Sequence, residues 1–94
     1  MNNEDYVSLE VARLLKEKGY PDPKGFAATL YEAQKWLREK HNIDVLPTIR
    51  EESPKKDYCC YIYKDAKVVN CKVAYGDDFY ECMNDSLIAA LQII

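Results

Sequence analysis

The stretch Thr29–Ile43 most constrains this fold, because it encodes a helix with both of its ends specified. Thr29 and Glu32 have the spacing of a capping box, in which each side chain accepts a hydrogen bond from a backbone N–H that the first turn leaves unpaired. At the other end, Asn42 is a residue type that adopts the left-handed conformation with which many helices end. We therefore expect a helix here, and we expect the rest of the chain to pack around it.

Two further helices are indicated by cap residues and by the spacing of apolar residues. Ser8 precedes the first, about Leu9 to Lys18, and Gly19 follows it as a stop. The other face of this helix is charged and is expected to face water; it carries Glu10, Arg13, Lys16 and Glu17. The last helix is capped by Asp77 or Asp78, and its helical period of apolar residues predicts that it lies across the core face of a sheet. Those residues are Phe79, Met83, Leu87, Ala90, Leu91 and Ile94.

Two segments rich in β-branched, aromatic and cysteine residues predict a β-hairpin. They are Asp57–Tyr63 and Val68–Tyr75, on either side of the turn Lys64–Lys67. A loop of two or four residues places one apolar set of side chains on the core face, with Tyr58 opposite Val73, Cys60 opposite Cys71 and Ile62 opposite Val69. The other face then carries Cys59, Tyr61, Tyr63, Val68, Asn70 and Lys72.

A third strand is predicted between the central helix and the hairpin. Apolar and polar residues alternate imperfectly from Ile43 to Arg50, and Pro47 suits a strand at a sheet edge because proline cannot donate to the ladder. The element order is helix, helix, three strands, helix. It predicts a single α+β domain over residues 1–94, in which a three-stranded antiparallel meander has helices packed on one face in a two-layer arrangement.

Composition and charge exclude several classes of protein. The net charge is −3, and acidic and basic residues are mixed along the chain, so no basic pole indicates nucleic acid or an anionic membrane. No apolar run approaches the roughly 18 residues that span a bilayer. The first ten residues, MNNEDYVSLE, are acidic and contain no apolar segment of a signal peptide, so we expect a cytoplasmic protein.

The residues that could carry chemistry have simpler structural explanations. His41 is the one histidine of the chain, and the dipole at a helix C-terminus favours a cationic side chain there. The four cysteines contain no C-x-x-C pair and sit in apolar periodic segments, where cysteine acts as a small buried hydrophobe. Cys59 points away from Cys60 and Cys71, and Cys82 lies on a helix, so no zinc site assembles. A Cys60–Cys71 disulfide fits the hairpin but not a reducing cytosol. We expect no catalytic residues, no metal and no cofactor.

The uncovered face of the sheet is the sequence's best candidate for an interaction surface. It presents Tyr61, Tyr63, Val68, Asn70 and Lys72, with Lys64 and Lys67 at its rim. Tyrosine is enriched at protein interfaces, although it also simply favours strands. We predict a non-enzymatic interaction module that self-associates as a homodimer or binds a protein partner. Sheet aromatics beside lysines are also typical of single-stranded nucleic-acid binding, the alternative, but the overall acidity argues against it.

The chain resembles a family of small uncharacterised proteins encoded in Bacteroidales genomes and their phages. The resemblance rests on VSLEVARLLKEKGY, on the T-x-x-x-A-x-K-W-L-R-E segment followed by an N-I pair, on the polar hairpin turn and on the closing helix. Relatives carry proline where Ala28 stands and glycine in the turn where Ala66 stands. The family has no assigned activity, so the resemblance implies an accessory protein of a mobile element and transfers no site residue.

Overall fold

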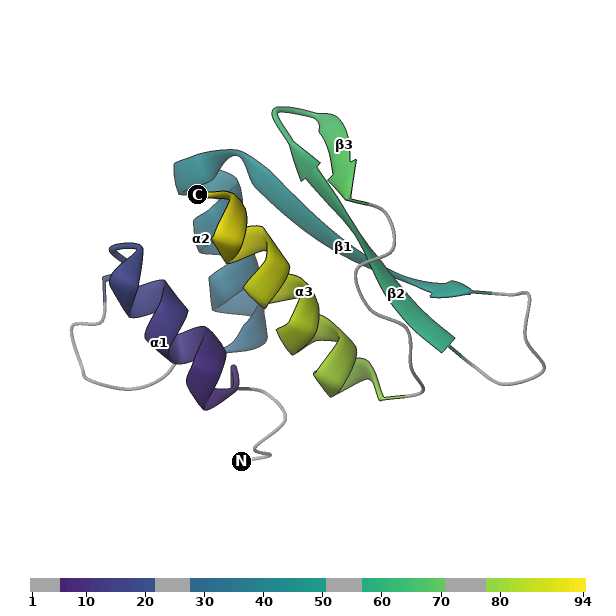
Figure 1. Ribbon diagram of the computed structural model, residues 1–94, viewed down its shortest axis with the longest axis horizontal. Helices are drawn as coiled ribbons and strands as arrows, with labels where there is room; N and C mark the ends of the chain where they lie inside the picture. Colours follow the sequence, from purple (N-terminus) through teal and green to yellow (C-terminus); the bar gives the residue numbers. More distant parts are fainter. Residues whose placement is uncertain (1–5, 22–27, 51–56, 71–77) are drawn as a thin grey trace.

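The computed structural model describes residues 6–21, 28–50, 57–70 and 78–94, and it has the predicted element order (Figure 1). The elements are α1 (Leu9–Glu17), α2 (Leu30–His41), β1 (Ile43–Arg50), β2 (Asp57–Lys64), β3 (Lys67–Asn70) and α3 (Phe79–Ile93). The strands form one antiparallel sheet in the order β1-β2-β3, and helices pack on it. The prediction of an α+β fold with a three-stranded meander is confirmed.

Each helix begins at the cap residue that its sequence indicates. The Ser8 Oγ accepts a hydrogen bond from the Val11 N–H at 3.3 Å, and the Asp78 Oδ1 accepts one from the Glu81 N–H at 3.2 Å. Thr29 and Glu32 form the complete capping box, with reciprocal bonds of 3.1 and 2.9 Å. These bonds satisfy donors that the first turn of any helix leaves unpaired, so they depend only on residues three apart in the chain.

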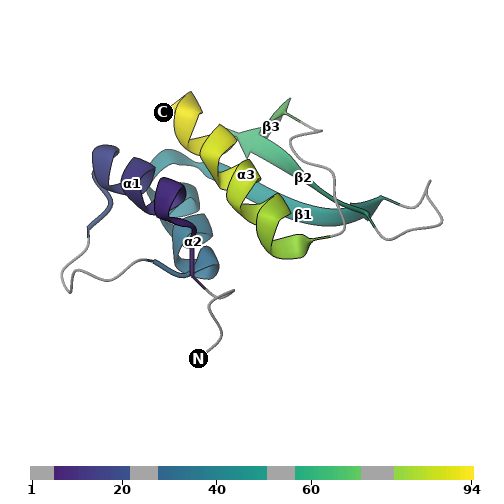
Figure 2. The ribbon, with the colours of Figure 1, turned by 60° about the horizontal axis from the view of Figure 1, so that its bottom comes forward.

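The central helix of the fold is α3, and the expectation that the chain packs around α2 is wrong. α3 lies between the sheet and α1, so that it is covered on two sides (Figure 2). Seven of its side chains are consequently buried, against three of α2. Phe79, at the start of α3, is the exception to its predicted core positions: it is 44% exposed and its ring packs edge-to-face on Tyr58.

The β2–β3 hairpin has a two-residue turn, and its register departs from the prediction after two pairs. Asp65 and Ala66 both have positive φ, 53° and 66°, the conformation that a tight hairpin turn requires. Lys64 pairs with Lys67 and Tyr63 with Val68 as predicted, but a bulge then places Asn70 opposite Ile62. The predicted Ile62–Val69 pair is therefore wrong, and Val69 is 49% exposed instead of buried. The predicted Cys60–Cys71 and Tyr58–Val73 pairs lie outside the described residues.

β1 is an edge strand, as Pro47 predicts, and side chains of α2 bond to it. The Gln34 Nε2 donates to the Val45 carbonyl at 2.9 Å, and the Arg38 Nε donates to the Asp44 Oδ1 at 3.0 Å. A carbonyl bonded in this way is not offered to the strand of another chain. The α2 side of the sheet is thus better protected against strand addition than a bare edge would be.

The turn of the hairpin is tied to the end of α2. Asn42 ends the helix with φ 54°, in the predicted left-handed conformation. Its carbonyl accepts a hydrogen bond from the Asp65 N–H, and its Nδ2 donates to the Asp65 Oδ1, both at 3.0 Å. Two residues of positive φ, 23 positions apart, therefore fix one another and orient β2 and β3 relative to the helical layer.

Candidate interaction surface on the open sheet face

The strand alternation of β2 separates a covered face of the sheet from an uncovered one. Cys60 and Ile62 are fully buried on the side where α3 packs. The residues between and after them point to the other side, because successive side chains of a strand alternate. On that side Tyr61 pairs with Leu46 of β1, and Tyr63 pairs with Val68 of β3. We call these four residues, Leu46, Tyr61, Tyr63 and Val68, the open-face patch.

The patch remains accessible to water despite its apolar character. Leu46 is 46% exposed, Tyr61 38% and Val68 51%, and Tyr63 is partly exposed. Cross-strand partners have Cβ atoms about 5 Å apart, so each of the two pairs forms a continuous apolar area. An exposed apolar patch on a small protein is the usual mark of an interaction site.

Three of the five predicted surface residues come together in this patch. They are Tyr61, Tyr63 and Val68, whereas Asn70 ends β3 as the ladder partner of Ile62, and Lys72 lies outside the described residues. Leu46 was missed as a surface residue. The sequence does place Leu46 on the polar side of β1 together with Asp44. Because the alternation in β1 is imperfect, this placement alone did not identify Leu46 as part of an exposed surface.

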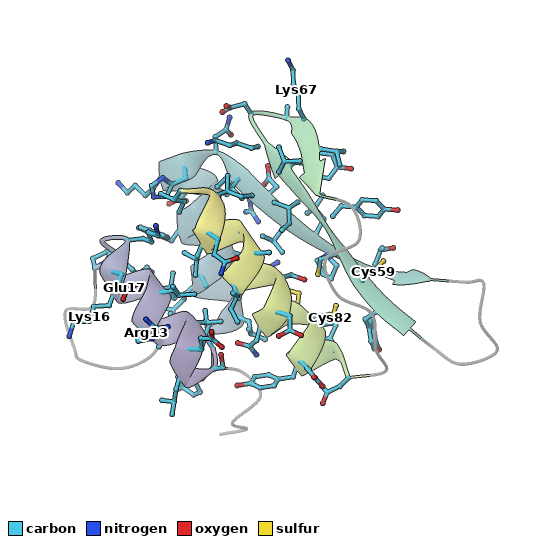
Figure 3. The ribbon with its side chains drawn as sticks, in the orientation of Figure 1. Arg13, Lys16, Glu17, Cys59, Lys67 and Cys82 are labelled. Carbon is cyan, nitrogen blue, oxygen red and sulfur yellow. The ribbon has the colours of Figure 1, made fainter. Side chains whose placement is uncertain are left out.

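Two lysines lie at the hairpin tip, but strand alternation places them on the other side of the sheet from the open-face patch, so the predicted basic rim is wrong. Lys64 and Lys67 are direct cross-strand partners, and Figure 3 shows Lys67 projecting from the end of the hairpin. The ion pairs in the described part of the chain are Arg13–Glu17 and Arg38–Asp44, so neither lysine is neutralised there. Like charges placed directly opposite one another are destabilising. The hairpin tip, and not the open-face patch itself, would therefore favour an anionic group on a partner.

Cys59 does not belong to the open-face patch. Its position in β2 places it on the same side as Tyr61, as predicted, but it is only 6% exposed. Cys60, on the covered side, meets Cys82 of α3, with 3.9 Å between the two Sγ atoms. Burial raises the pKa of both thiols, that of Cys82 to about 12, because the charged thiolate is poorly solvated there. Both are protonated at neutral pH, which does not suit a catalytic nucleophile.

The side chains that were candidates for catalysis or metal binding make packing contacts or face water. The His41 ring packs edge-to-face on Trp36, with 4.8 Å between ring centroids, and Trp36 packs in the same way on Tyr20. Within the described ranges, no three His, Cys, Asp or Glu side chains form a group that could hold a metal. The charged face of α1 is exposed as predicted, with Arg13 and Glu17 joined at 3.1 Å (Figure 3).

None of the helices in the described ranges has both the length and the hydropathy to cross a bilayer. Comparisons with protein-family models, with curated proteins and with solved structures find no match to this chain. The resemblance to small Bacteroidales and phage proteins therefore stays a prediction. The fold and the open-face patch are the basis for any functional proposal.

Proposed function

We propose that this chain is a small non-enzymatic interaction module that binds protein through its open-face patch, first of all a second copy of itself. The observation that carries the proposal is the alignment of Leu46, Tyr61, Tyr63 and Val68 across all three strands on the side opposite the helices. The resemblance to mobile-element proteins would make it an accessory protein of such an element, acting in the cytoplasm.

The chemistry of the patch supports a protein partner over a small ligand. Tyrosine supplies a large apolar ring and a hydroxyl while fixing only two side-chain torsions, which makes it an efficient interface residue. The patch also lies on a sheet, whose backbone is held by its ladder, so little order has to be gained on binding. A second copy is the first partner to test, because it is present wherever the chain is and at the same concentration.

The test is the molar mass of the reduced protein, measured by light scattering across a wide concentration range. We expect a dimer at high concentration, and we expect the double variant Tyr61→Ser/Tyr63→Ser to be a monomer with an unchanged far-ultraviolet circular dichroism spectrum. A wild-type monomer at every concentration would contradict self-association, and a foreign protein would then be the partner to seek. Loss of folding in the double variant would show instead that the patch is part of the core.

Leu9→Ser is the matched control for this experiment. Leu9 is 90% exposed at the start of α1. The variant therefore removes an exposed apolar side chain from a helix and leaves the sheet unchanged. We expect this variant to dimerise like the wild type. An equal loss of dimer in Leu9→Ser would show that association follows total surface hydrophobicity and not the open-face patch.

Single-stranded nucleic-acid binding is the second candidate, favoured by one observation. Lys64 and Lys67 at the hairpin tip are neighbours of Tyr63 and Val68 in the chain but point to the other side of the sheet, so a strand with a base stacked on Tyr63 would have to pass around the tip for its phosphate to reach them. Such binding would weaken with salt and would be lost in Lys67→Glu and Lys72→Glu variants. Fluorescence anisotropy with labelled oligonucleotides at low salt tests it, and the absence of any binding there would rule it out.

A further inference from the structure

Three sulfur atoms from two elements meet in the core where β2 packs on α3. The Cys60 Sγ lies 3.9 Å from the Cys82 Sγ and 3.7 Å from the Met83 Sδ. All three residues are at most 3% exposed. Cys59 and Cys82 are labelled near this crossing in Figure 3, and β2 and α3 are in contact there. We call Cys60, Cys82 and Met83 the sulfur cluster.

The surroundings of the cluster include one polar group. Ser86 is fully buried one turn after Cys82, and its hydroxyl donates to the Cys82 carbonyl at 2.7 Å. Burial raises the pKa of both Cys60 and Cys82. Polar groups outside the ligand set help to orient metal ligands, and the Ser86 hydrogen bond holds the backbone of Cys82.

We propose that the sulfur cluster binds a soft monovalent metal ion, Cu(I), through the Cys60 and Cys82 sulfurs and the Met83 thioether. Thiolate and thioether ligands select Cu(I) over harder ions. Metal–sulfur bonds of about 2.3 Å in a trigonal arrangement separate the sulfurs by about 4 Å, close to the 3.9 and 3.7 Å that separate the Cys60 sulfur from the other two. The Cys60 sulfur therefore already lies at a suitable distance from each of the other two sulfurs.

The binding reaction is an exchange of metal for protons. Each Cu–thiolate bond that forms replaces one S–H bond, the sulfur keeps its electron pair for the metal, and the proton goes to solvent. The Met83 sulfur contributes a lone pair and loses no proton. Neither copper nor sulfur changes its oxidation state, so the protein must be reduced, and raising the pH should strengthen binding.

This donor set does not suit zinc. Structural zinc sites have four nitrogen, oxygen or thiolate ligands in a tetrahedron, and thioether is not among them. Within the described ranges, no group of three His, Cys, Asp or Glu ligands converges. A two- or three-coordinate sulfur site is instead the environment in which Cu(I) is stable, and burial protects the ion from oxidation.

The experiment is an anaerobic competition between the full chain and a chromophoric Cu(I) chelator, with a non-thiol reductant present. We expect one Cu(I) per chain, accompanied by an ultraviolet thiolate-to-copper charge-transfer band. Cys60→Ala and Cys82→Ala should each weaken binding at least about 100-fold, and Met83→Leu should weaken it about 10-fold while preserving core volume. A parallel titration with Zn²⁺ should show no comparable site.

Cys59→Ala is the matched control, because Cys59 is buried on the same strand and points to the opposite face. It should bind Cu(I) like the wild type. The proposal is overturned if the reduced wild type yields all its copper to the chelator, if Cys59→Ala loses as much affinity as Cys60→Ala, or if Zn²⁺ competes equally. Met83→Leu should fold, so it still tests the proposal if a cysteine variant unfolds. Unchanged Cu(I) affinity and an unchanged charge-transfer band in Met83→Leu would show that Met83 is not a ligand.

Discussion

Adjacent residues of β2 experience two different environments, although both are apolar. Ile62 is fully buried against the helical layer, whereas Tyr61 is 38% exposed on the other side of the same strand. Leu46 shows that hydrophobicity alone does not decide burial, because it is 46% exposed while its neighbour Val45 is 2% exposed. In the described ranges, helices cover one side of the sheet only, so we expect that side to carry the stability and the other side to be the one used in the proposed binding.

Truncation of Ile62 and of Tyr61 is the most severe test of the difference between the two sides of the sheet. Ile62→Ala should lower the free energy of unfolding by about 2–5 kcal/mol, because it leaves a cavity in the covered face. Tyr61→Ala should cost less than about 1 kcal/mol, since its side chain is already partly in water. Urea denaturation, at protein concentrations where the chain is monomeric, measures both changes in the free energy of unfolding. Equal losses would mean that something also covers the open face.

A rise in pH tests the burial of the same covered side without truncating a large side chain. The pKa of Cys82 is raised to about 12 by burial, from an ordinary value of 9.0, so the folded state keeps its thiol proton after the unfolded state has lost it. Since the unfolded state then binds fewer protons, the free energy of unfolding should fall as the pH rises from about 9 towards 12. Urea denaturation over this range should show a flatter dependence for Cys82→Ala. Parallel curves would contradict burial of this thiol.

The far side of α3, which faces α1, provides a third test. The Asn84 Oδ1 accepts a hydrogen bond from the Ser8 N–H at 2.7 Å, and the Asn84 Nδ2 donates to the Tyr80 carbonyl at 2.9 Å. Asn84→Ala should cost about 1–3 kcal/mol, because it leaves the backbone donor at the start of α1 without its acceptor. Gln92→Ala, at an exposed position of the same helix, is the control and should be nearly neutral in thermal denaturation.

The smallest expected effect is a gain at the hairpin tip. Ala66 has φ 66°, a conformation in which its Cβ is crowded and which glycine adopts freely. Ala66→Gly should therefore stabilise the fold by about 0.5–1 kcal/mol and leave the core untouched. Ala89→Gly, inside α3, should instead destabilise by about 1 kcal/mol. A loss in Ala66→Gly, measured by chemical denaturation, would contradict the two-residue turn.

Features that depend on neighbours in the chain were predictable from the sequence. The caps at Ser8, Thr29 and Asp78 each join residues three apart, and the left-handed Asn42 needs only its own short side chain. Strand alternation predicted the burial of Cys60 and Ile62 and placed Tyr61 and Tyr63 on the other side, but it did not predict the burial of Cys59. The element order, with helices on one face of the sheet, followed from these signals.

Features that depend on contacts between distant segments were decided by the tertiary structure. The sequence indicates α2 more clearly than α3, although α3 is the more buried helix. Caps and apolar spacing predict that a helix forms, but they do not predict how many other elements pack against it. The bulge beside Ile62 shifts the register of β3 by one residue, a change that alternation in a single strand does not encode. That Cys60 meets Cys82 follows from the crossing of a strand and a helix 22 residues apart. Local chemistry therefore determined the elements, and packing in three dimensions determined which of their side chains meet.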